Sequence, residues 1–298
     1  MSNSLYKDDK YEIKLDEELG FFHLFPIPSK EELEKYYEKE FYSQNFSRQI
    51  NDSSDQVQEE EREFIEMQYA DIVEILDKES VGKRIFDIGC GYGNFLKFCS
   101  QKGYEVGGID PSEDAVTQIK SKLGFNVVKT DIEDVKGIVK EKYHTAVLLN
   151  VLEHLRKPQD VLIDIHDNVL EDKGLLVVRV PNEFNKLQLI ANQEFDLKQW
   201  WVCPPQHINY FTIQHLENLI NKSGYEVFLK ESSFPLEMFI LFGDQYVGNP
   251  QLGKIIHNKR VNFEKILTKH DNSYKRLLFQ NFAEMGLGRE ITIYARKK

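Results

Sequence analysis

The sequence predicts an α/β fold built on a doubly wound parallel sheet, and three observations carry this prediction. Short apolar runs alternate with helical patterns between residues 82 and 232, which is typical of parallel strands with helices on both faces. A glycine-rich turn follows the first apolar run, and an aspartate ends the second. The chain has 298 residues, of which 41% are hydrophobic, enough to bury a core in two domains or in one large domain with additions.

Residues 1–58 are predicted to form an N-terminal helical cap and a linker. Ser29 is followed three residues later by Glu32, which is typical of a capping box at the start of a helix. An aromatic cluster near this capped helix consists of Tyr36, Tyr37, Phe41 and Tyr42. We expect them to pack the helix onto the rest of the protein. The alternative is a lid over a pocket, hinged at the polar stretch that starts at Asn51.

Residues 59–232 are predicted to form the core of the protein. Its first helix carries Ile65, Tyr69, Ile72 and Leu76 on one face. The expected strands are 84–88, 104–109, 125–128, 145–149 and 175–180, followed by a helix at 214–223 and a strand at 225–230. Residues 233–288 are mostly helical by pattern, and residues 289–298 contain the alternating strand Glu290–Arg296. We see no internal repeat.

The turn after the first expected strand contains Gly89, Gly91 and Gly93. Glycine tolerates positive φ and has no Cβ, so a ligand can approach the backbone of this turn, next to the free N–H groups of a helix start. Asp110 ends the next strand, where its carboxylate can accept both hydroxyls of a ribose. We therefore expect a nucleoside-containing cofactor. The structural alternative is an ordinary tight turn, with Asp110 before Pro111 serving only as a helix cap.

The glycine spacing differs from that of a dinucleotide-binding loop, which would place its third glycine at position 94, where this chain has Asn94. In this chain the motif that starts at Asp87 reads Asp-x-Gly-x-Gly-x-Gly. Three more motifs follow at later strand ends: Asp110 at the second strand, Thr130-Asp131-Ile132 after the third and Asn150-Val-Leu-Glu-His-Leu155 after the fourth. With them, residues 60–232 and the final strand resemble the class I S-adenosylmethionine-dependent methyltransferases. The resemblance implies a Rossmann-like seven-stranded sheet of order 3-2-1-4-5-7-6, with an antiparallel last strand and residues 233–288 as a helical insertion before it.

The same resemblance implies which residues bind the cofactor. They are Asp87, Gly89, Gly91 and Gly93 for the methionine end, Asp110 for the ribose, Asp131 and Ile132 for the adenine, and Asn150 and Val151 from the fourth strand. The cofactor would be S-adenosyl-L-methionine, and the product S-adenosyl-L-homocysteine (SAH).

Methyl transfer to oxygen needs a group that removes the proton of the acceptor hydroxyl. The candidate catalytic residues are His154, at the expected carboxyl edge of the sheet, and His207 with Tyr210 in a later loop. Trp200 and Trp201 share that loop, and aromatic residues with polar tips suit a pocket for a small hydroxylated ligand. The structural alternatives are that His154 only packs near the cofactor and that His207 braces Tyr210 or a backbone carbonyl.

Several segments also look like bacterial methyltransferases of sugar, surface-polysaccharide and quinone pathways: Leu24–Tyr37, Val180-Pro181-Asn182 and His207–Thr212. We therefore expect O-methylation of a hydroxyl of a sugar or related metabolite. The alternatives are C-methylation of a nucleotide-linked sugar, a nicotinamide-dependent oxidoreductase and a non-catalytic partner protein. Residues 233–288 can build a wall of the acceptor pocket or a homodimer surface, and their basic residues can attract a phosphorylated substrate or merely form a solvated face.

The composition argues against several other partners. The formal net charge is −11, so the chain lacks the counter-charge that binding to nucleic acid requires. Cys90, Cys99 and Cys203 have neither CxxC spacing nor a neighbouring histidine cluster, so we predict no disulfide framework, as suits the cytoplasm. In the resembling methyltransferases the segment like Leu24–Tyr37 often follows a zinc-binding cysteine set, and this chain has no cysteines there, so no metal is expected. No secretory signal and no membrane-spanning segment are expected from the sequence.

Overall fold

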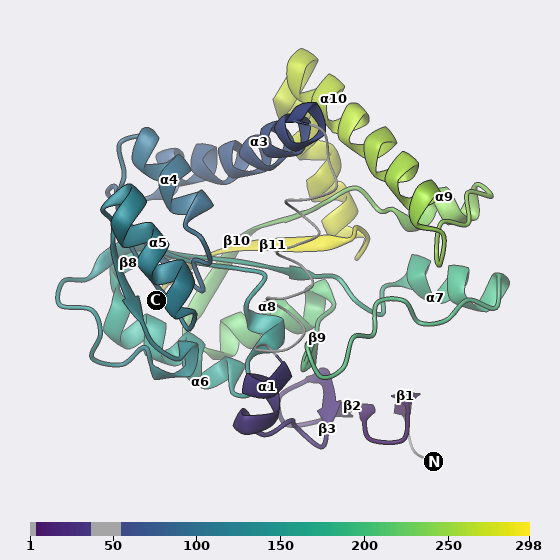
Figure 1. Ribbon diagram of the computed structural model, residues 1–298, viewed down its shortest axis with the longest axis horizontal. Coiled ribbons are helices and arrows are strands. Elements are labelled where there is room, and N and C mark those ends of the chain that lie inside the picture. The colour runs from purple at the N-terminus through teal and green to yellow at the C-terminus, as the bar shows by residue number, and fades with distance from the viewer. Residues whose placement is uncertain (1–3, 37–54) are drawn as a thin grey trace.

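The computed structural model describes residues 4–36 and 55–298. Figure 1 shows a large central sheet with helices on both sides, and a smaller sheet beside it at the N-terminus. The predicted aromatic residues Tyr37, Phe41 and Tyr42 and the start of the predicted linker at Asn51 lie outside the described residues. Among the helices of the described ranges, none is both long enough and apolar enough to cross a membrane.

The central sheet has seven strands in the order β10-β11-β8-β7-β4-β5-β6. Its strands are β4 (Arg84–Ile88), β5 (Glu105–Asp110), β6 (Asn126–Lys129), β7 (Tyr143–Leu149), β8 (Leu170–Pro181), β10 (Tyr225–Ser232) and β11 (Glu290–Lys297). Strands β4 to β8 run parallel, and β11 is antiparallel to both β8 and β10. Numbered along the core from β4, the order is 3-2-1-4-5-7-6, which confirms the predicted fold.

Helices cover both faces because the central strands are apolar on both sides. One apolar cluster joins the sheet to α3 and α4, and a second joins it to α6 and α8. The helices of the core are α3 (Asp55–Glu79), α4 (Asn94–Gln101), α5 (Glu113–Leu123), α6 (Pro158–Asp164), α7 (Lys186–Glu194) and α8 (Ile213–Lys222). Short helical turns lie at η2 (Ile132–Asp134), η3 (Leu152–His154) and η4 (Ile165–Val169). The turns η2 and η3 follow β6 and β7, so they lie at the carboxyl edge of the sheet.

The N-terminal region contains more strand than the sequence predicted. It forms an antiparallel sheet of β1 (Ser4–Lys7), β2 (Glu12–Asp16), β3 (Phe21–Phe25) and β9 (Asn209–Tyr210), and α1 (Lys30–Tyr36) is its one described helix. The expected helix start is present, because the Ser29 hydroxyl accepts a hydrogen bond from the Glu32 N–H at 3.2 Å. The expectation of a purely helical cap is corrected by the pairing of β3 with β9, almost 190 residues later, which no local pattern reveals.

Residues 233–288 are helical, as predicted. They contain α9 (Glu237–Leu241) and α10 (Pro250–Glu284), and α10 departs from helical geometry at Asp271, with φ −161° and ψ 91°. The Asp271 carboxylate accepts a hydrogen bond from the Tyr274 N–H at 2.9 Å, so the second half of α10 begins with its own N-cap.

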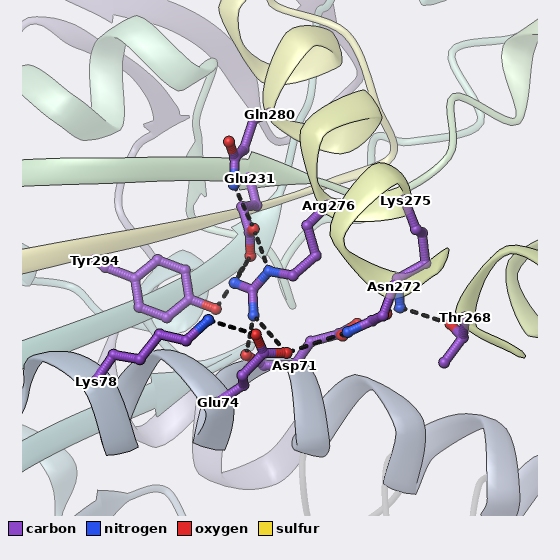
Figure 2. Close-up of polar contacts among 10 residues, drawn as sticks. All are labelled: Asp71, Glu74, Lys78, Glu231, Thr268, Asn272, Lys275, Arg276, Gln280 and Tyr294. Carbon is purple, nitrogen blue, oxygen red and sulfur yellow. Dashed lines mark hydrogen bonds and ion pairs between the residues drawn. The ribbon is translucent and has the colours of Figure 1, made fainter. Parts of the chain in front are cut away.

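A polar network fastens the second half of α10 to the core (Figure 2). Arg276 donates two hydrogen bonds to the Glu231 carboxylate of β10, at 2.9 and 2.8 Å, and one to the Asp71 carbonyl of α3 at 2.8 Å. The fully buried Lys275 ammonium lies 2.7 Å from the Asp71 carboxylate. These buried charges are therefore paired, and they hold the inserted helix against both α3 and the sheet.

Candidate active site

The glycine turn after β4 has the conformation that the sequence predicted. Gly89, Gly91 and Gly93 have φ values of 77°, 50° and 76°. A Cβ at Gly89 would lie 2.6 Å from Val151 Cγ2 and 3.3 Å from Ile132 Cδ1, so this position needs glycine. A Cβ at Gly91 would meet nothing within 4 Å. The turn is therefore packed against the ends of β6 and β7 at Gly89 and open at Gly91.

Asp110 lies beside this turn. One of its carboxylate oxygens accepts a hydrogen bond from the Gly91 N–H at 2.7 Å, and the other accepts from the Ser112 N–H at 2.9 Å. Burial raises the pKa of Asp110 despite these two hydrogen bonds. The neighbouring Asp87 is 3% exposed, and burial together with the charge of Asp110 raises its pKa to about 8. Burial and the neighbouring Asp110 thus favour the protonated form of Asp87.

The predicted residues after β6 and β7 surround the same edge. Asp131 caps η2 by accepting a hydrogen bond from the Glu133 N–H at 3.0 Å, and it pairs with Lys30 at 2.6 Å. Although burial acts in the opposite direction, the contact with Lys30 holds the pKa of Asp131 below its ordinary value. Asn150 has a φ of 59°, and its side-chain amide donates to the Glu290 carboxylate at 3.2 Å. The turn after β7 is thus tied to the start of β11.

Two histidines meet at this edge although 53 positions separate them in the sequence. The rings of His154 and His207 lie 5.2 Å apart between centroids. His154 Nδ1 lies 2.7 Å from the Gln206 carbonyl oxygen, and His207 Nδ1 lies 3.0 Å from a carboxylate oxygen of Glu183. Each Nδ1–H therefore donates to a fixed acceptor. The Nε2 atom of His154 lies 3.7 Å from a Glu153 carboxyl oxygen.

Their surroundings give the two histidines opposite properties. Burial and the charge of His207 lower the pKa of His154 to about 4, so His154 stays neutral. Burial also acts to lower the pKa of His207, but the hydrogen bond and the charge of Glu183 raise it above its ordinary value. Glu153 is 1% exposed, and burial raises the pKa of its carboxyl group to about 8. His207 is therefore the stronger base of the two.

The same cluster offers ligands for a metal ion. One ligand atom each from Glu153, His154 and His207 lie within 4.8 Å of one another. Both histidines donate through Nδ1 to a carbonyl or a carboxylate, as metal-binding histidines usually do. No metal was expected from the sequence, because the cysteine set of the resembling methyltransferases is missing. The fold alone brings His207 to Glu153 and His154.

The loop before β9 is held by backbone acceptors of η3. The Asn209 amide donates to the carbonyls of Leu152 and Leu155, at 3.0 and 2.7 Å, and the Ile208 N–H donates to the Glu153 carbonyl at 2.8 Å. These bonds fix His207 relative to His154.

The family model of the methyltransferase domain matches residues 59–230, more than half of the chain. The chain belongs to this family. The resemblance to class I S-adenosylmethionine-dependent methyltransferases is thereby confirmed, and S-adenosylmethionine is the cofactor.

Individual relatives are more distant. The ubiquinone biosynthesis O-methyltransferase of Glaesserella parasuis is 29% identical over 128 residues, which are 39% of this chain and 54% of that protein. The chain spans about half the length of the first curated relatives that it matches.

Two solved structures share the fold. The S-adenosylmethionine-dependent methyltransferase of Archaeoglobus fulgidus aligns with a TM-score of 0.52, at 22% identity, over 86% of this chain and 100% of that one. The magnesium protoporphyrin IX methyltransferase of Synechocystis PCC 6803, solved with SAH bound, aligns with a TM-score of 0.54, at 15% identity, over 91% of this chain and 100% of that one.

Two of the aromatic residues near His207 are buried inside this methyltransferase. Trp201 and Tyr210 are 1% and 0% exposed, and both belong to the apolar cluster beneath the N-terminal sheet. Burial raises the pKa of Tyr210, and its ring lies 6.2 Å from that of His207 between centroids. Tyr210 thus lies behind His207, because β9 buries it against β3.

The two acidic side chains of the site, Glu183 and Glu153, were not expected from the sequence to take part in it. Glu183 follows the quoted motif Val180-Pro181-Asn182 directly, but nothing in the sequence indicated that it would contact His207. Glu153 belongs to the motif Asn150–Leu155, without a role of its own in the prediction, and it is almost fully buried. Both glutamates follow the end of an expected strand closely. In a chain with candidate catalytic histidines, a carboxylate at such a position is the signal that would have suggested Glu153 and Glu183 as their partners.

Proposed function

We propose that this methyltransferase moves the methyl group of S-adenosylmethionine to a hydroxyl oxygen of a small molecule, most simply a sugar or related metabolite. The observation that carries the proposal is the contact of His207 Nδ1 with the Glu183 carboxylate at 3.0 Å. It gives the protein an oriented base at the edge of the sheet where the glycine turn lies. The relatives named as O-methyltransferases support oxygen as the accepting atom.

The residues around the glycine turn fit the cofactor. A Cβ at Gly91 would stand in open space, so a ligand can reach the backbone there. In our proposal the methionine end lies against Asp87, Gly89, Gly91 and Gly93, the ribose hydroxyls bind Asp110, and Asp131 with Ile132 flanks the adenine. Asn150 and Val151 would border the cofactor from the end of β7. When bound, the sulfonium supplies an activated methyl group.

The protein's part in the reaction is alignment and proton removal. We assign the base to His207, whose Nε2 would take the proton of the acceptor hydroxyl as its oxygen attacks the methyl carbon. The bond from methyl carbon to sulfur breaks in the same step, and sulfur keeps the electron pair. Glu183 keeps His207 in the tautomer with a free Nε2. Neutral His154 and buried Tyr210 are placed in this proposal as positioning residues.

In this proposal, different segments of the chain bind the cofactor, cap the site and form the wall of the acceptor site. We propose residues 59–232 and 289–298 as the cofactor-binding core, residues 1–58 as the cap, and residues 233–288 as the wall of the acceptor site. The strand β9 supports this use of the cap, because it joins the loop of His207 to the N-terminal sheet.

A second route to the same product rests on the cluster of Glu153, His154 and His207. A divalent cation held by these three side chains would lower the pKa of a bound hydroxyl, so that no protein base is needed. Chelation distinguishes the two routes, as described in the Discussion.

The proposal is tested in two steps. Calorimetry should detect SAH binding to the intact protein. Incubation with methyl-labelled S-adenosylmethionine and a panel of sugars, catechols and cell extract should then yield a methylated product, in which mass spectrometry distinguishes an O-methyl from a C-methyl group. Binding of SAH without any labelled product across the panel and the extract would contradict the acceptor class. Failure to bind SAH would contradict the cofactor site.

A further inference from the structure

A small polar cavity is lined by residues of α3, of α10 and of the strands β8, β10 and β11. Its volume is about 50 Å³. A space of roughly 10–15 Å³ admits one water molecule, so this cavity can hold a group of a few heavy atoms, such as a carboxylate. Glu264 and Phe279 of α10 form part of its wall, so the inserted helix helps to close it.

The cavity adjoins the edge of the sheet where the cofactor is proposed to bind. Glu290 lines the cavity, and its carboxylate accepts a hydrogen bond from the Asn150 side-chain amide at 3.2 Å. The Asn150 backbone N–H donates to the carbonyl of Arg179, another lining residue, at 2.9 Å. In the proposed function Asn150 borders the cofactor, so a group bound in the cavity lies next to that site.

Arg179 is the one basic residue among the described residues that line the cavity, and its charge is unpaired there. Its side chain has a single hydrogen bond to a described residue, which Nε donates to the Thr292 hydroxyl at 3.4 Å. The terminal nitrogens Nη1 and Nη2 therefore have no acceptor in the described parts of the chain. A guanidinium group presents its N–H groups as a planar fork, and this fork matches a carboxylate.

Two hydroxyl groups add donors to the same lining. The Ser233 hydroxyl oxygen accepts a hydrogen bond from the Glu290 N–H at 3.0 Å, and the Thr292 hydroxyl oxygen accepts from Arg179 Nε. Because each oxygen is used as an acceptor, each hydroxyl hydrogen can still donate. The unused polar groups around Arg179 are thus donors, which an anion satisfies.

The carboxylates of the lining leave the charge of Arg179 unpaired. Three of the four have basic partners, two of which Figure 2 shows: Asp71 with Lys275, Glu231 with Arg276, and Glu264 with Arg260. The fourth, Glu290, forms no ion pair with any described residue, and the Asn150 amide is the one described donor to its carboxylate. Arg179 and Glu290 are therefore the two lining charges that remain for a ligand.

Two basic residues of the insertion are less suited to bind an anion. Lys259 pairs with Asp244 at 3.1 Å, and Lys265 pairs with Glu63 at 3.0 Å. For these two lysines, the pairing supports a solvated and internally paired face over the alternative of attracting a phosphorylated substrate.

Building on the proposed methyl transfer, we propose that this cavity binds a carboxylate of the acceptor, and that the acceptor is a hydroxy acid such as a sugar acid. The carboxylate lies against Arg179 and accepts hydrogen bonds from the hydroxyls of Ser233 and Thr292. A neighbouring hydroxyl of the acceptor donates to Glu290. Such a ligand satisfies both remaining charges, whereas a phosphate monoester brings a charge of about −2 next to Glu290.

The test uses the intact protein saturated with SAH and two matched pairs of probes, D-glucuronate with D-glucose and 3,4-dihydroxybenzoate with catechol. Only the first compound of each pair carries a carboxylate. In calorimetry we expect at least one acid to bind about tenfold or more tightly than its neutral partner, because it gains charge-assisted hydrogen bonds. Arg179→Met should remove this preference and leave the affinity for the neutral partner unchanged. Absence of a preference in the parent, or its persistence in Arg179→Met, would overturn the proposal.

Two further variants and one further probe sharpen the test. Arg179→Lys keeps the charge without the planar fork, so its affinity for the acid should lie between those of the parent and Arg179→Met. The matched control is Arg296→Met, at the other end of β11, where Arg296 pairs with Glu79 at 3.0 Å; it should bind the acid like the parent. Tighter binding of D-glucose 6-phosphate than of D-glucuronate would overturn the assignment of a carboxylate.

The carboxylate of the cofactor is the competing source of the same chemistry. Arg179→Met should bind SAH like the parent, and an SAH affinity about tenfold weaker would place the cofactor carboxylate at Arg179 and overturn the proposal. Glu290→Ala should weaken the acid and its neutral partner alike, because both carry the hydroxyl. Unchanged affinity for both would contradict the contact with Glu290.

The outcomes also separate this inference from the proposed function on which it rests. Failure of the parent protein to bind SAH counts against the proposed function. Binding of SAH with labelled methyl transfer to a neutral acceptor, and without any preference for the acids, counts against this inference alone.

Discussion

The Glu183 carboxylate lies 3.0 Å from His207 Nδ1 at the carboxyl edge of the sheet. Glu183 is 1% exposed and follows the end of β8, whereas His207 lies in the loop before β9. A buried carboxylate fixes the tautomer of the imidazole and favours its protonated form. In the proposed function, this contact orients His207 as the base at the edge of the sheet that also carries the glycine turn.

The pH dependence of turnover should report this contact. His207 must be neutral to accept a proton, and its pKa is raised, so the rate should fall as pH drops through that pKa. Glu183→Gln removes the stabilising negative charge and should move this acidic limb to lower pH by about one unit. His207→Ala should lower kcat by about 100-fold or more and leave SAH affinity within about twofold. Equal rates for His207→Ala and the parent would remove His207 from the chemistry.

Gly89 should tolerate no side chain. Gly89→Ala would place a Cβ 2.6 Å from Val151 Cγ2, at a φ of 77°, and should abolish measurable SAH binding by calorimetry. Gly103→Ala is the matched control, because Gly103 has a φ of 82° and open space around it. It should cost about 1 kcal/mol of stability from backbone strain alone and leave SAH affinity unchanged. If both variants bound SAH equally well, the close approach at Gly89 would have no role in binding.

Asp110 should contribute to cofactor affinity in two ways. Its carboxylate holds the Gly91 N–H at 2.7 Å and is assigned to the ribose hydroxyls. Asp110→Ala should weaken SAH binding by about 2–3 kcal/mol, because a hydroxyl pair and a backbone N–H lose their acceptor. Asp110→Asn keeps one acceptor oxygen and should therefore weaken SAH binding less than Asp110→Ala does. An unchanged dissociation constant for Asp110→Ala would show that the ribose lies elsewhere.

The ion pair of Arg276 with Glu231 should govern the stability of the inserted helix. Arg276→Met leaves Glu231 buried without its main partner and should lower the free energy of unfolding by about 3 kcal/mol or more. Replacing both residues, as Arg276→Met with Glu231→Leu, should restore most of this loss. Chemical denaturation measures the free energy of unfolding of the single and the double variant. A single variant that costs less than about 1 kcal/mol would mean that solvent already screens the pair.

Chelation should decide between the two routes of proton removal. With His207 as the base, dialysis against a chelator should leave methyl transfer unchanged. Loss of activity that Zn²⁺ or Mn²⁺ restores would instead identify Glu153, His154 and His207 as a metal centre. In that case Glu153→Gln should lose metal binding together with activity, because a neutral amide is a poor ligand.

The sequence alone determined the features that depend on short-range chemistry. The strand from Arg84 to Ile88, the positive φ angles of the glycine turn and the capped start of α1 follow from residue types a few positions apart. The place of Asp110 beside the turn also followed, because parallel strands bring their carboxyl ends to one edge. These expectations needed no knowledge of distant contacts, and the structure contains them.

Only the tertiary structure decided which distant residues meet. The pairing of β3 with β9 replaced a helical cap by a sheet and buried Tyr210 behind His207. The meeting of Glu183 with His207, and of Arg276 with Glu231, joins residues 24 and 45 positions apart in the chain. Local patterns specify which face of an element is apolar, but a buried polar side chain finds its partner only when whole elements pack, so its role is fixed by the assembled fold.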